Sequence, residues 1–207
     1  MNSAHAKYIN IALAFVWIFF VYINLSAFFQ RPQLSVLLFI LAQSEFVVLL
    51  LIRKPAITIT RRVDDYAVAI AGTFIALLFE PSVYGNASIG LYSIIQYLGD
   101  ALIYVGVLIE IVAFLYLNKS AGIVPANRGV KVNGLYQYVR HPIYASYLFL
   151  YTGYVLNNPS SFNCGLLILA LILQMWRIKK EEAVLLQDPI YREYSKKVRW
   201  KLLPGVL

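Results

Sequence analysis

The chain has 207 residues, of which 60% are hydrophobic and only 14% are charged, and its mean hydropathy is +0.68. Such a composition is typical of membrane proteins and excludes an ordinary soluble domain. The net charge of +8 would favour nucleic-acid binding in a soluble protein, but here Lys and Arg gather between the apolar segments and in the C-terminal tail. There they set the orientation of membrane helices and contact anionic lipid head groups. Membrane lipids are therefore expected partners, and nucleic acid is not.

Six apolar segments follow one another along the chain, each about long enough for a membrane helix or for a shorter hairpin helix. They are Tyr8–Phe29, Leu34–Ile52, Tyr66–Phe79, Leu91–Leu117, Ile143–Leu156 and Phe162–Trp176. The first is too long for the core of a signal peptide, so we expect it to be retained. The sequence thus predicts an all-α integral membrane protein with about six transmembrane helices.

The last two segments are short, and the link between them is rich in residues that break helices. This link, Asn157-Asn158-Pro159-Ser160, favours a tight turn. We therefore expect the fifth and sixth helices to form a short antiparallel hairpin. The chain is interpreted as a single membrane domain, 1–207, with four helices in residues 1–117. Residues 118–207 hold a polar loop, the hairpin and a polar C-terminal tail.

The distribution of Lys and Arg among the loops predicts how the helices are oriented. Nearly all of them lie between helices two and three, between helices four and five, and after helix six. The opposite loops contain a single one, Arg31. The positive-inside rule then places both termini, and with them a helical C-terminal tail, in the cytoplasm. Because no N-terminal targeting signal is visible, the expected location is the plasma membrane of a prokaryote, with a eukaryotic endomembrane as the alternative.

Cysteine and histidine are too few and too scattered to predict a metal centre. Cys164 is the only Cys, and His5 and His141 lie far apart in the sequence. The chain has neither an HExxH motif nor a CxxC pair. No residue is therefore assigned as a metal ligand.

Three acidic residues lie inside the expected spans, namely Glu45, Asp100 and Glu110. Intramembrane carboxylates are functional candidates by default, because a charge is costly at that depth. Glu110 is the strongest of them, since Asp100 lies near the end of a span. A paired structural role is an equally simple interpretation of each.

Two ionisable clusters stand at the ends of the fifth and sixth helices that are expected to face the cytoplasm. Arg140, His141 and Pro142 precede the fifth helix, where free backbone N–H groups suit an anionic ligand. Arg177 and Glu181 follow the sixth helix four residues apart, so they would share one face of a continuing helix. A carboxylate suits a cationic ligand group, and the planar guanidinium suits an anionic one.

The same residues also have simpler interpretations. Arg140 and His141 could be a snorkelling pair at the membrane interface, with the nearby tyrosines as an interfacial aromatic belt. Arg177 and Glu181 could form an exposed salt bridge at a helix exit, which contributes little stability. Residue type and spacing alone do not separate these interpretations from a binding site.

The order of motifs in the C-terminal third decides between them. The chain contains Gly134-Leu-Tyr136, Arg140-His141-Pro142-x-Tyr144, Gly153, Asn158-Pro159, Arg177-x-x-x-Glu181-Glu182 and Tyr191-x-x-Tyr194-x-x-x-Val198. This ordered set resembles the isoprenylcysteine carboxyl methyltransferase family, whose wider group includes the phospholipid N-methyltransferases, and its tail is similar to that of prokaryotic-type members. One departure is Asp188-Pro189-Ile190, which stands where the family usually has Phe-Gly.

The resemblance implies a membrane enzyme that transfers a methyl group from S-adenosyl-L-methionine to a lipophilic acceptor, either a carboxylate or an amine. By motif position, the implied cofactor-binding residues are Tyr136, His141, Pro142, Ile143, Tyr144, Glu181 and Glu182, with the segment Arg128–Lys131 as a further part of that site. Arg177 matches the family's substrate-contacting arginine, so Arg177 and Glu181 are the implied catalytic residues. Glu181 would bind the cofactor's amino group, and Arg177 would orient an anionic acceptor that arrives from the bilayer.

Two other functions compete with methyl transfer. A membrane reductase of the sterol reductase type has a similar C-terminal fold and a related His-Pro-x-Tyr stretch, and it would use NADPH. A non-catalytic membrane protein that kept the fold is the other alternative. The double acid Glu181-Glu182, four residues after Arg177, favours the methyltransferase.

Overall fold

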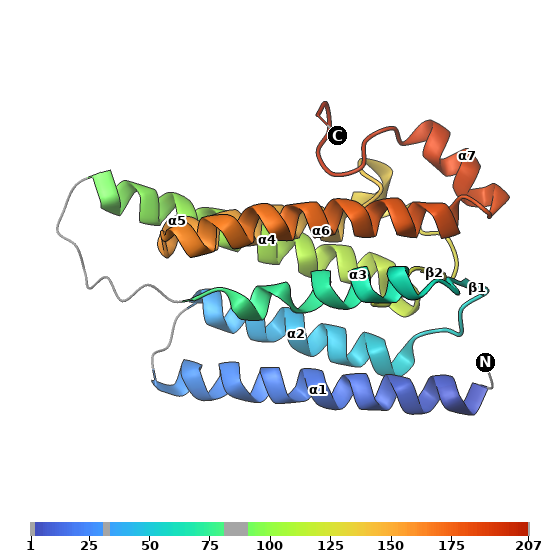
Figure 1. Ribbon diagram of the computed structural model, residues 1–207, viewed down its shortest axis with the longest axis horizontal. Coiled ribbons are helices and arrows are strands. Elements are labelled where there is room, and N and C mark those ends of the chain that lie inside the picture. The colour runs from blue at the N-terminus through green and yellow to red at the C-terminus, as the bar shows by residue number, and fades with distance from the viewer. Residues whose placement is uncertain (1–2, 31–33, 81–90, 207) are drawn as a thin grey trace.

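The computed structural model describes residues 3–30, 34–80 and 91–206, and most of them are helical (Figure 1). The helices are α1 (Ser3–Gln30), α2 (Leu34–Ile52), α3 (Val63–Phe74), α4 (Leu91–Leu117), α5 (Pro142–Asn157), α6 (Ser161–Leu185) and α7 (Pro189–Lys197). The 3-10 turns η1 (Ile75–Leu78), η2 (Asn118–Ser120) and η3 (Gly134–Gln137) and the strands β1 (Thr58–Ile59) and β2 (Ala126–Asn127) complete the described elements. The expected all-α class is confirmed.

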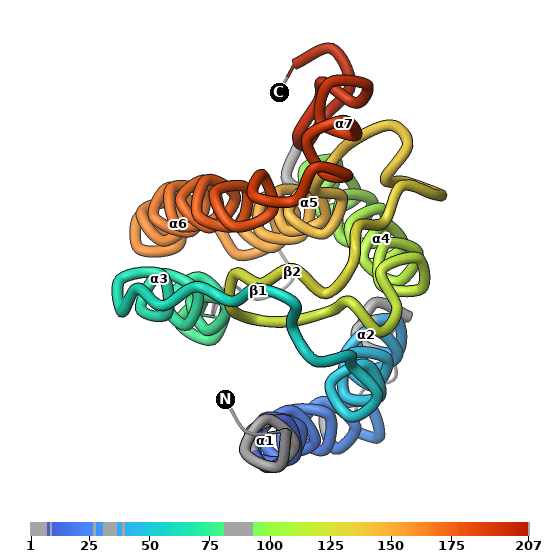
Figure 2. Tube along the Cα trace, turned by 90° about the vertical axis from the view of Figure 1, so that its right-hand side faces the viewer, coloured from blue at the N-terminus to red at the C-terminus, as the bar shows by residue number. Residues whose placement is uncertain are grey.

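The long helices run side by side and contact one another in the order α1, α2, α4, α5, α6 and α3 (Figures 1 and 2). Viewed end-on in Figure 2, they form an arc with α1 and α3 at its two ends. Trp17 on α1 meets Phe74 on α3, with their ring centroids 5.7 Å apart. This aromatic contact closes the arc, so all six helices surround a common interior.

Helices α4 and α5 pack closely through glycines. A Cβ atom added to Gly99 would lie 2.9 Å from the carbonyl oxygen of Gly153, and one added to Gly153 would lie 2.5 Å from that of Gly99. A Cβ added to Gly106 would lie 2.8 Å from Cγ of Leu150. Small residues let helix backbones approach in this way. This packing fixes the inward face of α5, which carries much of the site described below.

Within the residues that the structure describes, three segments are long and apolar enough to cross a membrane: Asn10–Gln30, Ser93–Ser120 and Ser161–Leu185. Ile40–Ile52 within α2 is a shorter apolar helix. The second and fourth expected segments have the same bounds as α2 and α4, whereas the third becomes a short α-helix followed by the turn η1. The total of six transmembrane helices stays a prediction.

The predicted length of the sixth helix is wrong. The apolar pattern predicts an end at Trp176, but α6 continues to Leu185 and is not short. The residues after Trp176 include no helix breaker, and several of their polar side chains find partners on neighbouring elements. Arg177 and Glu181 therefore lie within α6 itself rather than after it. At its other end, the hydroxyl of Ser160 accepts a hydrogen bond from the backbone N–H of Asn163 and caps the helix after the expected turn.

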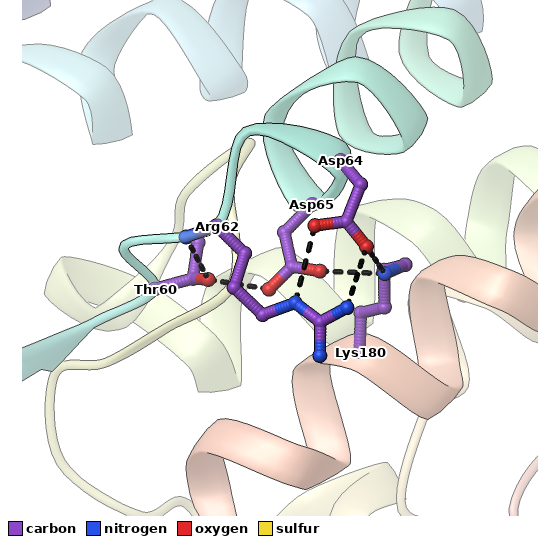
Figure 3. A network of polar contacts seen from close by, with 5 residues as sticks. All are labelled: Thr60, Arg62, Asp64, Asp65 and Lys180. Atoms are coloured by element: carbon purple, nitrogen blue, oxygen red, sulfur yellow. Dashed lines mark hydrogen bonds and ion pairs between the residues drawn. The ribbon is translucent and has the colours of Figure 1, made fainter.

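A charged network fastens the start of α3 to α6 (Figure 3). Nζ of Lys180 on α6 lies 2.7 Å from Oδ1 of the buried Asp65 and also contacts Asp64. The hydroxyl of Thr60 donates to Asp65, and Arg62 pairs with Asp64. The hydrogen bond from Lys180, together with Arg62, lowers the pKa of Asp64 to about 2, so Asp64 stays ionised at any physiological pH.

The network also places Gly72 of α3 against α6. A Cβ atom added to Gly72 would lie only 2.5 Å from Cδ of Arg177. Only hydrogen at this position leaves room for the arginine stem. The rotation of α6, and hence the direction of its polar side chains, is thus set partly by α3.

The N-terminus of α1, the strands β1 and β2, the C-terminal end of α6 and helix α7 gather at one end of the bundle, on the right in Figure 1 and called the site end below. The loop-charge asymmetry predicts that this end faces the cytoplasm. Because the native Cys164 is exposed, labelling would use a Cys164→Ser background. Cysteine at Lys131 or Ser195 should not react with an impermeant maleimide added outside intact cells.

The matched control is cysteine at Ser161, which is exposed at the opposite end of α6 and should react from outside. Permeabilised cells should show reaction at Lys131 and Ser195, which proves that these sites are accessible. Reaction of either of them in intact cells would reverse the orientation.

Candidate active site

The loop between α4 and α5 folds across the site end of the bundle. Strand β2 pairs antiparallel with β1, which brings Asn127 opposite Thr58. The side-chain amide of Asn127 donates to Oδ2 of Asp188 at 2.7 Å, and its carbonyl oxygen accepts from the backbone N–H of Gly129 at 2.8 Å. Gly129 has φ of 103°, a conformation that side chains disfavour. Asp188, the departure from the usual family motif, therefore anchors this loop to the start of α7.

The C-terminal tail forms a strap over the start of α5. The backbone N–H of Arg140 donates to the carbonyl of Trp200 at 3.0 Å, and that of His141 donates to the carbonyl of Lys201 at 2.8 Å. The guanidinium of Arg140 also donates to the carbonyls of Ser195 and Val198, each at 3.1 Å. These bonds hold the residues just before α5 in one conformation.

Glu182 on α6 joins the strap, the α5 start and the bundle. Its Oε1 lies 2.8 Å from Nη2 of Arg140 and 3.3 Å from Nε2 of His141, and its Oε2 lies 2.7 Å from Nζ of Lys201. The residue is only 8% exposed. Glu182 is absent from the residues that line the cavities described next, so in this structure it holds the wall of the site together from behind. The cofactor contact implied for it by motif position stays a prediction.

A cavity of about 730 Å³ occupies the interior of the helix arc. This size is in the range of small-molecule sites. At the site end it is lined by Ser120, Arg128, Tyr136, His141, Tyr144 and Glu181, and it also reaches Asp100 and Asn157. A second cavity of about 50 Å³ shares Arg128, Tyr136, His141 and Glu181 and is bounded by α7. The structure thus brings most of the sequence-predicted residues to one place.

Glu181 lies where the two cavities meet. Its Oε2 accepts a hydrogen bond of 2.7 Å from the hydroxyl of Tyr144, and no ion pair is present at its carboxylate among the described residues. Ile143 lines the larger cavity beside Tyr144, while Pro142 is buried and starts α5. A carboxylate at a cavity wall without a cationic partner is suited to a cationic ligand group.

Arg177 projects from α6 into the larger cavity and is only 6% exposed. Its Nη1 donates to Oε1 of Gln174 at 3.0 Å, and its guanidinium carbon lies 5.1 Å from the ring centre of Tyr144. No described carboxylate forms an ion pair with it, and its Nε has no hydrogen-bond partner. The exposed salt bridge between Arg177 and Glu181 is therefore wrong, because Arg177 is buried and no ion pair joins the two side chains among the described residues.

Arg128 is a buried guanidinium with unused hydrogen-bonding capacity. It is 8% exposed, lines both cavities, and has no hydrogen bond or ion pair from its side chain within the described part of the chain. A Cβ atom added to Gly122 would lie 2.6 Å from Nη1 of Arg128, so glycine at this position makes room for the guanidinium. Burial lowers the pKa of Arg128, and the nearby Glu181 opposes that effect. The pair is suited to a ligand with both an anionic and a cationic group.

Tyr136 connects the loop to the tail. Its backbone carbonyl accepts a hydrogen bond from the hydroxyl of Tyr194, and its side chain is 6% exposed. Burial raises the pKa of Tyr136 well above its usual value, so the phenol stays neutral and keeps its proton to donate. Tyr136 thus lines both cavities as a neutral donor held in place by α7.

Four tyrosines form a row on α5, and the family motifs predict a binding role only for the first of them. Tyr144, Tyr147, Tyr151 and Tyr154 all line the larger cavity. Ring centroids are 6.1 Å apart for the first pair and 5.8 Å apart for Tyr147 and Tyr151. An interfacial belt, one of the alternatives for Tyr144 and Tyr147, is therefore wrong for these two. Their spacing of three, four and three residues was the available signal, because it repeats on one helix face.

The three intramembrane acids differ in their surroundings. Oδ1 of Asp100 accepts a hydrogen bond of 2.6 Å from the amide of Asn157, so Asp100 is paired between α4 and the end of α5. Glu110 is 9% exposed and lines the larger cavity, and its Oε2 has no partner. Both carboxylate oxygens of Glu45 are also buried, and no described residue forms a hydrogen bond with them.

Comparison with known proteins identifies the segment that builds the site. Residues 94–193, slightly less than half of the chain, match the family model described as phospholipid methyltransferase. This match confirms the wider group that the sequence motifs indicated. No curated protein matches the chain. The matched segment runs from α4 to α7 and includes Arg128, Tyr136, His141, Arg177 and Glu181.

The neighbours Glu181 and Glu182 should respond differently to loss of charge. Glu182→Gln leaves the cations Arg140 and Lys201, and the ring of His141, without their carboxylate partner, so we expect it to lower the free energy of unfolding by about 3 kcal/mol or more. Glu181→Gln loses at most one hydrogen bond and should cost about 1 kcal/mol or less. Reversible unfolding of purified protein in mixed detergent micelles measures both. Equal costs would show that the Glu182 network does not hold the tail.

Proposed function

From the match of residues 94–193 to the phospholipid methyltransferase family, we propose that this protein is an S-adenosyl-L-methionine-dependent methyltransferase acting on a lipophilic, membrane-embedded acceptor. The observation that carries the proposal is the site end of the larger cavity, where Glu181 and Arg128 both lack an ion-pair partner among the described residues. The proposal includes a multi-pass arrangement with the site end facing the cytoplasm, where the cofactor is supplied.

The residues at the site end suit the amino-acid part of the cofactor. That part carries an ammonium and a carboxylate, which match Glu181 and Arg128 in charge. Tyr136, His141 and Tyr144 would line the pocket around it, and the first backbone N–H groups of α5 add donors for negative charge. When bound, S-adenosyl-L-methionine supplies the methyl group on a sulfonium, which needs no activation by the protein.

The apolar middle of the cavity suits the acceptor. The larger cavity continues past Arg177 along the tyrosine face of α5 to Tyr154, between helices that are apolar on their outer faces. Arg177 presents a guanidinium there without a carboxylate partner, so it would orient an anionic group of the acceptor, such as a phosphate or a carboxylate. Apolar chains of the acceptor would occupy the remaining volume or extend toward the bilayer.

Positioning would supply most of the rate enhancement. Methyl transfer is an in-line displacement, so holding donor and acceptor in contact and in line removes much of the entropic cost. The glycine packing of α4 on α5 and the Glu182 network fix the walls that would do this. Tyrosine faces along α5 also favour positive charge in the cavity, through the negative electrostatic potential of the rings.

Glu181 and Arg177 are expected to have separable roles. Glu181→Gln should weaken binding of S-adenosylhomocysteine by about 1.5–3 kcal/mol, the usual loss for a hydrogen bond to a charged group. Arg177→Lys keeps the charge and loses the planar fork, so it should leave that affinity nearly unchanged and lower methyl transfer to membrane lipids. Calorimetry in detergent measures binding, and transfer of a radioactive methyl group into extracted lipids measures turnover.

The matched controls are Glu193→Gln and Arg192→Lys on the exposed face of α7, which make the same two substitutions away from the cavity. Neither should change affinity or turnover. Binding of NADPH by folded wild-type protein that does not bind S-adenosylhomocysteine would overturn the proposal in favour of a reductase. Small and equal effects of the Glu181 and Arg177 variants would place the site elsewhere.

A further inference from the structure

Glu110 stands out among the buried polar groups that the cofactor site does not use. It is 9% exposed, it lines the larger cavity, and its Oε2 is buried without a hydrogen-bond partner among the described residues. No ion pair joins it to Lys, Arg or His anywhere in the residues that the structure describes. An unpaired buried carboxyl group lowers the stability of the fold. A native structure that keeps one is therefore explained by a ligand that binds the group or by a proton that neutralises it.

A second unpaired carboxyl group supports the first. Glu45 lies on α2, which packs against α4, and in the described part of the chain neither of its buried carboxylate oxygens has a hydrogen-bond partner. Phe46, the neighbour of Glu45, and Phe114, one helical turn from Glu110, have ring centroids 5.1 Å apart, so the two acids lie at about the same level of the α2–α4 interface. Glu45 does not line the cavity, so Glu110 is the member of the pair that a ligand would contact. Two adjacent acids hold one proton or one cation more readily than a single acid does.

The wall opposite Glu110 completes a pocket for a cation. Tyr147 and Tyr151 on α5, whose rings stack 5.8 Å apart, line the same cavity as Glu110 and Arg177. The ring of Phe114, one helical turn from Glu110 on α4, lines the same cavity. A carboxyl group among aromatic faces is the arrangement that recognises an ammonium group. Arg177 faces the same space and repels a cation from its own side, which leaves the Glu110 side for positive charge.

We propose that Glu110, supported by Glu45, binds the ammonium group of a lipophilic amine acceptor and removes its proton before methyl transfer. This inference rests on the proposed function and deepens it, because it assigns binding and deprotonation of an acceptor amine to Glu110 and Glu45, which the family motifs do not include. Arg177 then takes an anionic group elsewhere on the same acceptor, and the two side chains together orient one molecule that bears both charges.

The chemistry balances in two steps. The ammonium of the acceptor gives one proton to the carboxylate of Glu110, which leaves a neutral amine and a carboxylic acid. The nitrogen lone pair then forms the N–C bond to the methyl group as the C–S bond breaks, and the bonding electrons stay on sulfur. The positive charge of the sulfonium passes to the methylated nitrogen. Glu45 is the nearby group that can share the proton held by Glu110.

Two probes of equal chain length test the site directly. Dodecylamine carries the ammonium, and dodecanoate carries a carboxylate on the same apolar chain. Purified protein in uncharged detergent should bind dodecylamine at least tenfold more weakly after Glu110→Gln, which keeps the size of the side chain and removes its charge. Binding of dodecanoate should be unchanged or tighter. Glu45→Gln should lower dodecylamine affinity by a smaller factor, and the exposed Glu193→Gln should change neither probe.

Methyl transfer separates binding from proton removal. If wild-type protein methylates dodecylamine, Glu110→Gln should lower that turnover at least a hundredfold at saturating probe. Glu110→Asp keeps the acid and should retain part of both the affinity and the turnover, which covers the case in which the amide variant fails to fold. S-adenosylhomocysteine affinity should be the same in all three proteins, because Glu110 does not line the small cavity at the cofactor end.

The failure of this inference is distinct from failure of the proposed function. Unchanged dodecylamine affinity in a folded Glu110→Gln protein would overturn the ammonium site while leaving cofactor binding intact. A higher melting temperature of the Glu110→Gln protein, without any loss of dodecylamine affinity, would show that Glu110 and Glu45 form a purely structural pair. Failure of the wild-type protein to bind S-adenosylhomocysteine would instead overturn the proposed methyltransferase, whatever the affinities for dodecylamine and dodecanoate.

Discussion

The carboxylate of Glu182 is the interaction on which the rest of the site depends. Glu182 is only 8% exposed, and its carboxylate contacts Arg140, His141 and Lys201. These residues come from the start of α5 and from the C-terminal strap. Without such a centre, like charges from the loop and the tail would repel each other at the end of the bundle. Because Glu182 and Glu181 are neighbours on α6, fixing the first toward the strap turns the second toward the cavity.

The interior of the protein orders charge along its length. Glu181 and Arg128 lie at the site end, Arg177 and Glu110 line the middle, and Asp100 pairs with Asn157 where α5 ends. In a bilayer each of these groups is expensive to bury, so their presence along a single cavity is hard to explain by folding alone. The tyrosine face of α5 runs past all of them and provides a continuous aromatic wall on which polar and apolar parts of a ligand can both rest.

Local patterns in the sequence were enough to locate α2, α4 and the Pro142 start of α5, because apolar runs and helix-starting residues act over a few positions. They also marked His141, Arg177 and Glu181 as candidates, but only the ordered motifs of a known family favoured a binding site over the simpler interpretations of these residues. They did not give the length of α6, since its polar C-terminal turns are stabilised by α3 and by the strap. The free guanidinium of Arg128 and the shared role of Glu182 depend on contacts between segments distant in the chain. No periodicity in the sequence records such contacts.

The close contact between Gly72 and Arg177 has an evolutionary consequence. Cδ of Arg177 occupies the space that any larger residue at position 72 would need. The two positions are therefore energetically coupled across the α3–α6 interface, although Gly72 touches no ligand in the proposed scheme. A change of acceptor that called for a shorter side chain at position 177 would open position 72 to alanine or serine, whereas the reverse order of substitutions would pass through a clash. Divergence of this pocket is thus directional, with the arginine changing before the glycine.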